Sequence, residues 1–202
     1  NTASTGESGV KGPTGLTGAG VTNTAAGGQL KTDNITQNGT LTTTANGLVT
    51  FTNASLLTIK NNCNAVVALT QAGAGPATVM GTRTITTTAD DVNFLRAVTL
   101  NGGQLNINTA GTGASTGDIT FQSTLTGATA GAENLNVTAG SSNILFTGAV
   151  GGTRLGAMTI NCATNGTEVA GLTTASLVPS AGPGTRLLTG AGTQNTGAGG
   201  PT

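Results

Sequence analysis

Histidine, tryptophan and tyrosine are absent from the 202-residue chain, and this absence excludes several kinds of active site. Without histidine the chain cannot build a Ser/His/Asp triad or a Cys/His pair, because both need an imidazole as the general base. Aromatic residues make up only 2% of the sequence. A thick core of large side chains is therefore excluded, and a core has to be built from small aliphatic and β-branched residues.

Charged residues are also scarce, at 7% of the chain, and seven basic residues balance seven acidic ones. Seven scattered basic residues do not form the groove that nucleic acid requires, so we expect no nucleic-acid partner. No apolar run approaches the ~18 residues of a transmembrane helix, so we expect no membrane-spanning segment. No signal peptide is visible, and because the sequence starts at Asn1 we expect a processed chain or a fragment.

Short segments that alternate apolar and polar residues fill the middle of the chain and indicate an all-β fold. Turns rich in Gly, Asn and Thr separate them, and no segment has apolar residues at helical spacing over three turns. The segments are LVTF (48–51), LLTI (56–59), AVVAL (65–69), TVM (78–80), AVTL (97–100), LNI (105–107), ITF (119–121), LNV (135–137), ILF (144–146), MTI (158–160) and LTTASLV (172–178).

The segments recur at a step of about 22 to 25 residues, which predicts a solenoid. ITF returns as ILF, LNV returns as MTI, and TTTAN (42–46) returns as TTTAD (86–90) after two steps. Stacked coils bury a narrow continuous core, which suits this composition. A β-sandwich or jelly roll is the alternative, since Asn-Gly turns such as 38–39 occur. The expected core residues are Phe51, Ile59, Leu100, Ile107, Ile119, Phe121, Leu135, Val137, Ile144, Phe146, Met158 and Ile160.

The two ends lack this pattern, and we expect them to be low-complexity arms outside a solenoid domain at 30–178. The arm at 1–29 contains GESGVKGPTGLTG, where Gly recurs at every third position as in collagen. Four complete triplets with a single proline are too few for a triple helix, so we interpret the run as an extended arm. The arm at 179–202 is rich in glycine, and its one apolar cluster is Arg186, Leu187 and Leu188.

The text of residues 89–165 resembles the β-strand repeats of large bacterial surface proteins of the filamentous-haemagglutinin and autotransporter-passenger type. The resemblance rests on GDITF, LTG, NLNVTAG, ILFTGAVGG and LGAMTI, and it extends more loosely over residues 39–88. It implies a single-stranded, right-handed parallel β-helix, secretion to the cell exterior, and adhesive or structural work. It implies no catalytic residues.

The two cysteines, Cys63 and Cys162, allow three arrangements. Two small buried side chains are the first, and a disulfide between subunits is the second. An internal bridge is the third, although the cysteines are separated by about four coils. Strands on successive coils lie ~4.8 Å apart, which puts the thiols beyond the ~7 Å Cα limit of a disulfide.

The acidic residues do not form a recognisable catalytic or metal site. Only Asp90 and Asp91 are adjacent, and neighbouring side chains on a strand point to opposite faces. We interpret them as a turn before VNF, and we expect no enzyme, no metal and no cofactor. Calcium at Asp90, Asp91 or Asp118 is disfavoured because the repeat pattern of calcium-binding coils is missing.

The Thr runs TLTTTA and TITTTA suggest one further function, since ranks of outward Thr on a flat solenoid face bind ice in some solenoids. Thr-x-Thr does not recur on every coil, so we do not expect such a face.

The preferred hypothesis is a structural subunit of an extracellular bacterial fibre or surface coat. The chain would self-associate as a homopolymer through uncapped solenoid ends and terminal arms, with Arg186, Leu187 and Leu188 inserting into a neighbour. The alternative is an adhesin segment that binds host carbohydrate or protein.

Overall fold

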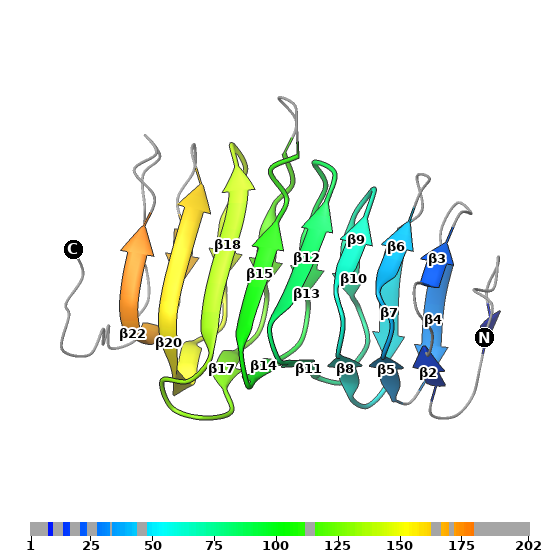
Figure 1. Cartoon of the computed structure of the whole chain (residues 1–202), viewed down its shortest axis with the longest axis horizontal. Coiled ribbons are helices and arrows are strands. Elements are labelled where there is room, and N and C mark those ends of the chain that lie inside the picture. Colours follow the sequence, from blue (N-terminus) through cyan, green and yellow to red (C-terminus); the bar gives the residue numbers. More distant parts are fainter. Residues whose placement is uncertain are drawn as a thin grey trace.

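The chain forms a stack of β-strands that run around a common axis, with the first described strands at one end of the stack and the last ones at the other (Figure 1). In this computed structural model the described backbone comprises residues 8–9, 14–16, 21–23, 28–32, 34–43, 48–111, 116–162, 167–169 and 172–179. Side chains are described for residues 34–43, 48–111, 116–161 and 174. Every regular element in this part of the chain is a β-strand.

Three strands complete each turn, and strands in the same position of successive turns form three faces. Face 1 consists of β1 (Ser8–Gly9), β4 (Gly28–Thr32), β7 (Val49–Asn53), β10 (Leu69–Gln71), β13 (Val92–Phe94), β16 (Ile119–Phe121), β19 (Ile144–Phe146) and β21 (Thr167–Val169). Face 2 consists of β2 (Thr14–Leu16), β5 (Ile35–Gln37), β8 (Leu57–Ile59), β11 (Ala77–Met80), β14 (Val98–Asn101), β17 (Leu125–Gly127) and the start of β20 (Val150–Cys162). Face 3 consists of β3 (Val21–Asn23), β6 (Leu41–Thr43), β9 (Cys63–Ala65), β12 (Arg83–Thr87), β15 (Gln104–Asn108), β18 (Asn134–Gly140), the end of β20 and the end of β22 (Leu172–Pro179), whose first residue pairs with Val150 on face 2.

All pairings between the described strands are parallel and join one turn to the next. This excludes the sandwich and confirms the predicted β-solenoid, because a sandwich is built from antiparallel strands. β20 continues around one corner, so faces 2 and 3 share a 14-stranded sheet while face 1 is a separate sheet of eight strands. The right-handed sense of the coil stays a prediction.

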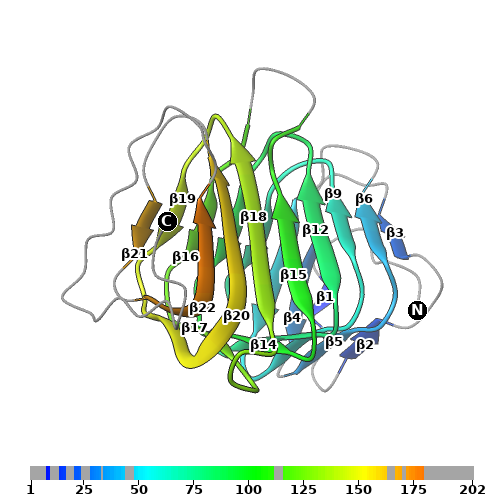
Figure 2. The ribbon, with the colours of Figure 1, turned by 60° about the vertical axis from the view of Figure 1, so that its left-hand side comes forward.

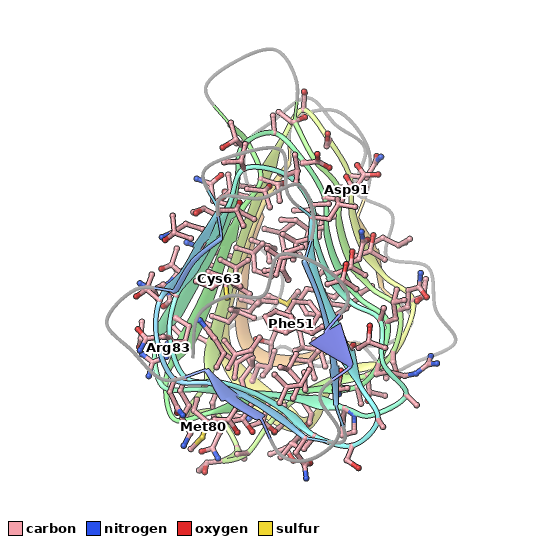
Figure 3. The ribbon with its side chains drawn as sticks, turned by 90° about the vertical axis from the view of Figure 1, so that its right-hand side faces the viewer. Phe51, Cys63, Met80, Arg83 and Asp91 are labelled. Carbon is pink, nitrogen blue, oxygen red and sulfur yellow. The ribbon has the colours of Figure 1, made fainter. Side chains whose placement is uncertain are left out.

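Alternation of small apolar and polar residues explains why these segments form strands. Most described strands have a buried residue on either side of a partly exposed one, as in β13 and β16. Val, Ile, Leu and Phe take the inward positions, and Thr and Asn take most outward ones. β-Branched side chains suit such a half-buried pleated surface. A view along the axis shows a three-sided tube filled by side chains, with Phe51 and Cys63 inside it (Figure 3).

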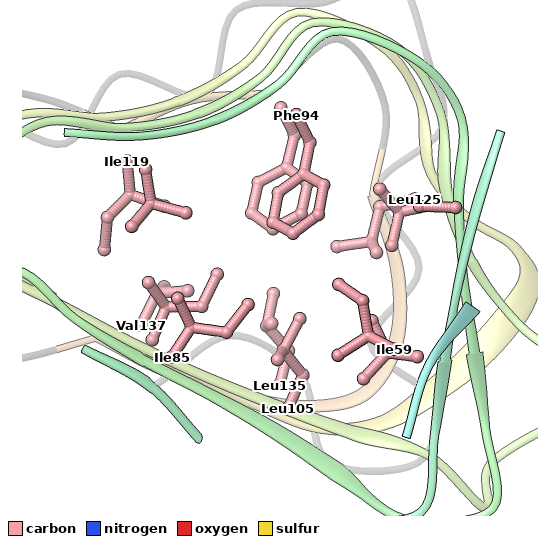
Figure 4. Close-up of a cluster of buried hydrophobic side chains, with 14 of the residues drawn as sticks. Ile59, Ile85, Phe94, Leu105, Ile119, Leu125, Leu135 and Val137 are labelled. Carbon is pink, nitrogen blue, oxygen red and sulfur yellow. The ribbon is translucent and has the colours of Figure 1, made fainter. Parts of the chain in front are cut away.

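The core is a set of columns in which each inward residue lies over its equivalent in the next turn (Figure 4). Phe94, Phe121 and Phe146 form one such column, with ring centroids 5.2 Å apart in both pairs and interplanar angles of 10° and 6°. All the residues expected in the core lie in it with at most 2% of their surface exposed: Phe51, Ile59, Leu100, Ile107, Ile119, Phe121, Leu135, Val137, Ile144, Phe146, Met158 and Ile160.

A buried amide interrupts the phenylalanine column. Gln71 is paired with Phe51 on one side and Phe94 on the other, and it is fully buried. Its Nε2 donates to Asn53 Oδ1 at 3.0 Å and to the Gly75 carbonyl at 2.8 Å. Because an unpaired amide in the core is strongly destabilising, these bonds are what allow Gln71 at this position. The bond to Gly75 connects β10 to the turn that leads from face 1 to face 2.

The predicted N-terminal boundary differs from the structure. β1, β2 and β3 lie within the range expected to be an arm, and they pair in parallel with β4, β5 and β6. Backbone pairing can continue where the apolar alternation of the sequence is weak, since ladder hydrogen bonds do not depend on side chains. The described parts of 1–29 therefore extend the solenoid. β22 ends at Pro179, next to the boundary expected at 178.

Candidate binding surface

Face 3 carries two columns of outward Thr and Asn side chains that run along the axis. The long column consists of Thr42, Asn64, Thr86, Asn108, Thr138 and Asn161, each paired with the next. The short column consists of Thr84, Asn106, Asn136 and Thr159, which are paired in the same way. The strands of this face lie side by side in Figure 2. None of these side chains is buried, so together they form a continuous polar surface.

Hydrogen bonds between turns hold several of these side chains in place. In the long column Thr86 Oγ1 donates to Asn64 Oδ1 at 2.8 Å, and Asn161 Nδ2 donates to Thr138 Oγ1 at 3.2 Å. Restricted χ1 rotamers of Thr add to this order. The columns therefore present hydroxyl and amide groups in nearly fixed positions.

The short column has similar bonds. Asn136 Nδ2 donates to Asn106 Oδ1 at 3.4 Å, and Gln104 Nε2 donates to the same oxygen at 2.6 Å. Asn106 thus accepts from its own strand and from the next turn. Each column therefore contains side chains that are held by hydrogen bonds from one turn to the next.

The other two faces have narrower outward surfaces. Face 2 has one threonine column, which consists of Thr36, Thr58, Thr78, Thr99 and Thr126. Face 1 has one mixed column, which consists of Thr50, Thr70, Asn93, Thr120 and Leu145. Most of these strands are three residues long and leave one central outward position, whereas β12, β15 and β18 have five or seven residues. Face 2 has a second outward pair at Met80 and Asn101, whereas the second column of face 3 continues through β12, β15, β18 and β20.

From the sequence we did not expect a face with rows of outward side chains, but face 3 carries two such rows, built from both Thr and Asn. A search for Thr-x-Thr alone finds the motif in too few turns, because Asn takes the equivalent positions in the turns between them. The segment Thr84-Ile85-Thr86 lies between two such turns. Its neighbours are Asn62-Cys63-Asn64 in the preceding turn and Asn106-Ile107-Asn108 in the following one. A pattern in which either Thr or Asn is allowed would have found the surface.

Cys63 is a free, fully buried thiol between Leu41 and Ile85 in an inward column of face 3. Burial raises the pKa of the Cys63 thiol to about 12. A disulfide between folded subunits would need this thiol at the surface, so Cys63 cannot form it. Cys162 ends β20 and its backbone pairs with Gly140, while its side chain lies outside the described residues.

The internal bridge is also excluded by the backbone. β9 and β20 are separated by four steps between turns, through β12, β15 and β18. At ~4.8 Å a step, Cys63 and Cys162 lie roughly 19 Å apart, well beyond the ~7 Å that a disulfide spans.

Most of the acidic side chains in the described part accept hydrogen bonds from backbone amides. Asp91 Oδ1 accepts from the amide of Asp118, and Asp118 Oδ1 accepts from the amide of Asn143, both at 2.8 Å. These bonds connect the corners before face 1 in three successive turns. Glu133 is 1% exposed, and its two oxygens accept from the amides of Gly102 and Thr129, each at 3.1 Å.

No group of three or more His, Cys, Asp and Glu side chains that could hold a metal ion occurs among the described residues. Asp90 lies next to Asp91 at the corner before β13, where a turn was expected, and its Oδ1 accepts from the Asp91 amide at 2.9 Å. The expected inserting residues Arg186, Leu187 and Leu188 lie outside the described residues. Within the described part, no helix has the length and apolar character of a membrane span.

No protein-family model, no curated protein and no solved structure matches this chain.

Proposed function

We propose that this chain is a non-enzymatic structural subunit of an extracellular bacterial fibre or surface coat, and that copies associate end to end. The observation that carries the proposal is the unbroken parallel ladder. β1, β2 and β3 stand at one end and β21 and β22 at the other, and each pairs with a single described neighbour. Unpaired strand edges are templates for further pairing.

Stacking of copies would continue the ladder that already joins one turn to the next. The contact joins unlike ends of two molecules, and such a contact produces an open filament when it does not close into a ring. With zero net charge the copies do not repel one another at long range. The bacterial and extracellular setting rests on the sequence resemblance alone.

Two further observations favour a structural role over the alternatives. Asp91, Asp118 and Glu133 are occupied by backbone amides, and so they are not converging on a substrate. All four phenylalanines are buried, so the described surface offers no aromatic platform for the sugar of an adhesin ligand. The adhesin alternative thus has no specific observation in its favour.

Sedimentation velocity and negative-stain microscopy of the purified chain test the proposal. We expect filaments of constant width whose length grows with protein concentration. A Thr22→Pro variant in β3 should shorten them, because proline removes an amide from a strand at the end of the stack. Thr22→Ala keeps the amide and should leave them unchanged. Short monodisperse rods at every concentration would overturn the proposal.

A further inference from the structure

The two outward columns of face 3 contain no charged side chain, and Arg83, at the start of β12, lies outside them. The long and short columns contain ten side chains, all of them Thr or Asn, and each group can donate or accept a hydrogen bond. Ionic ligands gain nothing from such a surface. The complementary partner is itself neutral and presents donors and acceptors in equal measure.

The surface is also periodic in two directions. Neighbouring turns place equivalent side chains ~4.8 Å apart along the axis, and alternate residues along a strand lie ~6.7 Å apart. Oxygen atoms in the surface of ice are arranged in rows on a closely similar length scale. We propose that face 3 binds ordered water, and that its ligand is the surface of an ice crystal.

The order of the side chains supports this ligand. A hydroxyl or amide contributes little when it binds a single water molecule, because bulk water competes equally well. Many such groups fixed in one frame bind together, and the second and later contacts come without further loss of freedom. The bonds from Thr86 to Asn64 and from Asn161 to Thr138 provide this fixation before any ligand arrives.

Face 3 suits this ligand better than faces 1 and 2 do. The threonine column of face 2 is one residue wide, and the exposed Lys60 lies at the end of β8 on that side. The outward column of face 1 includes Leu145, which has no hydrogen-bonding group, where Asn93 and Thr120 stand in the preceding turns. The surface of a crystal is periodic in two directions, so a face that binds it has to extend both along the axis and across it.

Two other flat partners are weaker candidates. A crystalline polysaccharide has a periodic neutral surface, but sugar rings usually rest on aromatic side chains, and the four phenylalanines here are in the core. A second copy of the chain would meet the columns face to face. Its Thr and Asn would then exchange hydrogen bonds with water for similar ones between copies, with little net gain.

The experiment measures the gap between melting and freezing of a single ice crystal in a solution of the purified chain, together with the shape of the crystal. We expect a measurable gap and a faceted crystal. Thr86→Tyr places a bulky ring in the middle of the long column and should abolish both effects. Thr99→Tyr is the matched control, because it introduces the same ring at an outward position of face 2, and it should retain them.

Circular dichroism melts of both variants show whether the fold is kept. If Thr86→Tyr fails to fold, Asn108→Tyr in the same column replaces it. The proposal is overturned if the unaltered chain neither shapes ice nor produces a gap, or if the control loses as much as the face 3 variant. Retention on microcrystalline cellulose that Thr86→Tyr abolishes, without any effect on ice, would assign the face to a polysaccharide and overturn it as well.

Discussion

Truncation of Phe121 tests whether stacking along the axis stabilises the solenoid. Phe121 stacks on Phe94 and on Phe146, with ring centroids 5.2 Å away on both sides. Phe51 occupies the same inward column but faces Gln71 in the next turn instead of a ring. Both phenylalanines are at most 1% exposed, so they differ in stacking rather than in burial.

The two truncations should therefore have different effects on the free energy of unfolding. Replacement of a buried Phe by Ala lowers it by about 3–5 kcal/mol through lost burial and the cavity left behind. Each stacked aromatic pair contributes a further ~0.5–1.5 kcal/mol. Phe121→Ala loses two such pairs and Phe51→Ala loses none, so we expect the first to be more destabilising by roughly 1–3 kcal/mol.

Denaturant titrations followed by far-ultraviolet circular dichroism measure this difference, since the chain has no tryptophan or tyrosine to report by fluorescence. Phe146→Ala loses one stacked pair and serves as the intermediate case. The expected order of destabilisation is Phe121, then Phe146, then Phe51. An equal or larger effect of Phe51→Ala would refute the idea that the column is stabilised by stacking.

Two more predictions concern the core and the corners. In a Cys162→Ser background, the free energy of unfolding should not depend on the Cys63 thiol below pH ~8.5, the ordinary pKa at which the unfolded thiol ionises. It should fall by ~1.4 kcal/mol per pH unit above that value, because burial keeps the folded thiol protonated up to a pKa of about 12; unfolding midpoints that do not move with pH would contradict this. Gly75→Ala should lower stability by at least ~2 kcal/mol, since its Cβ would clash with the backbone of Ser55. Gly152→Ala, whose Cβ has its nearest neighbour at 3.6 Å, should be nearly neutral, and equal melting temperatures of these two variants would contradict the clash.

The repeats that were visible in the sequence coincide with the pairing of turns. Ile119 pairs with Ile144, and Leu135 pairs with Met158, as the recurrence of ITF and LNV predicts. Alternation therefore determines both the inward face and the register, because a shift by one residue would turn every apolar side chain outward. For this reason all twelve predicted core residues are buried, although the described core contains thirty apolar residues.

The lengths of the turns could not be predicted in the same way. The step from Val49 to Leu69 is 20 residues, while the step from Ile107 to Val137 is 30. The additional residues lie at the corners, where individual side chains hold the backbone. Glu133 is an example, since its carboxylate accepts from two backbone amides. These contacts depend on residues in other turns, so no local pattern reveals them.

Polar residues were the main source of error. Gln71 occupies an inward position that alternation assigns to an apolar side chain, and only its bonds to Asn53 and Gly75 make it suitable. The columns of face 3 were missed because Asn and Thr are exchanged from turn to turn. Both cases involve hydrogen bonds across turns, which a linear reading of composition does not contain.

The direction of the ladder hydrogen bonds has a mechanical consequence. The bonds between turns run parallel to the axis, so tension applied to the two ends of the chain would peel off the outermost turn one bond at a time. Each released turn of 20 to 30 residues would lengthen the chain by roughly 7–11 nm. The interior turns would stay folded meanwhile, because each touches only its neighbours. Such a stack extends in discrete steps of unequal length under load, and each step absorbs work while the remaining turns stay folded.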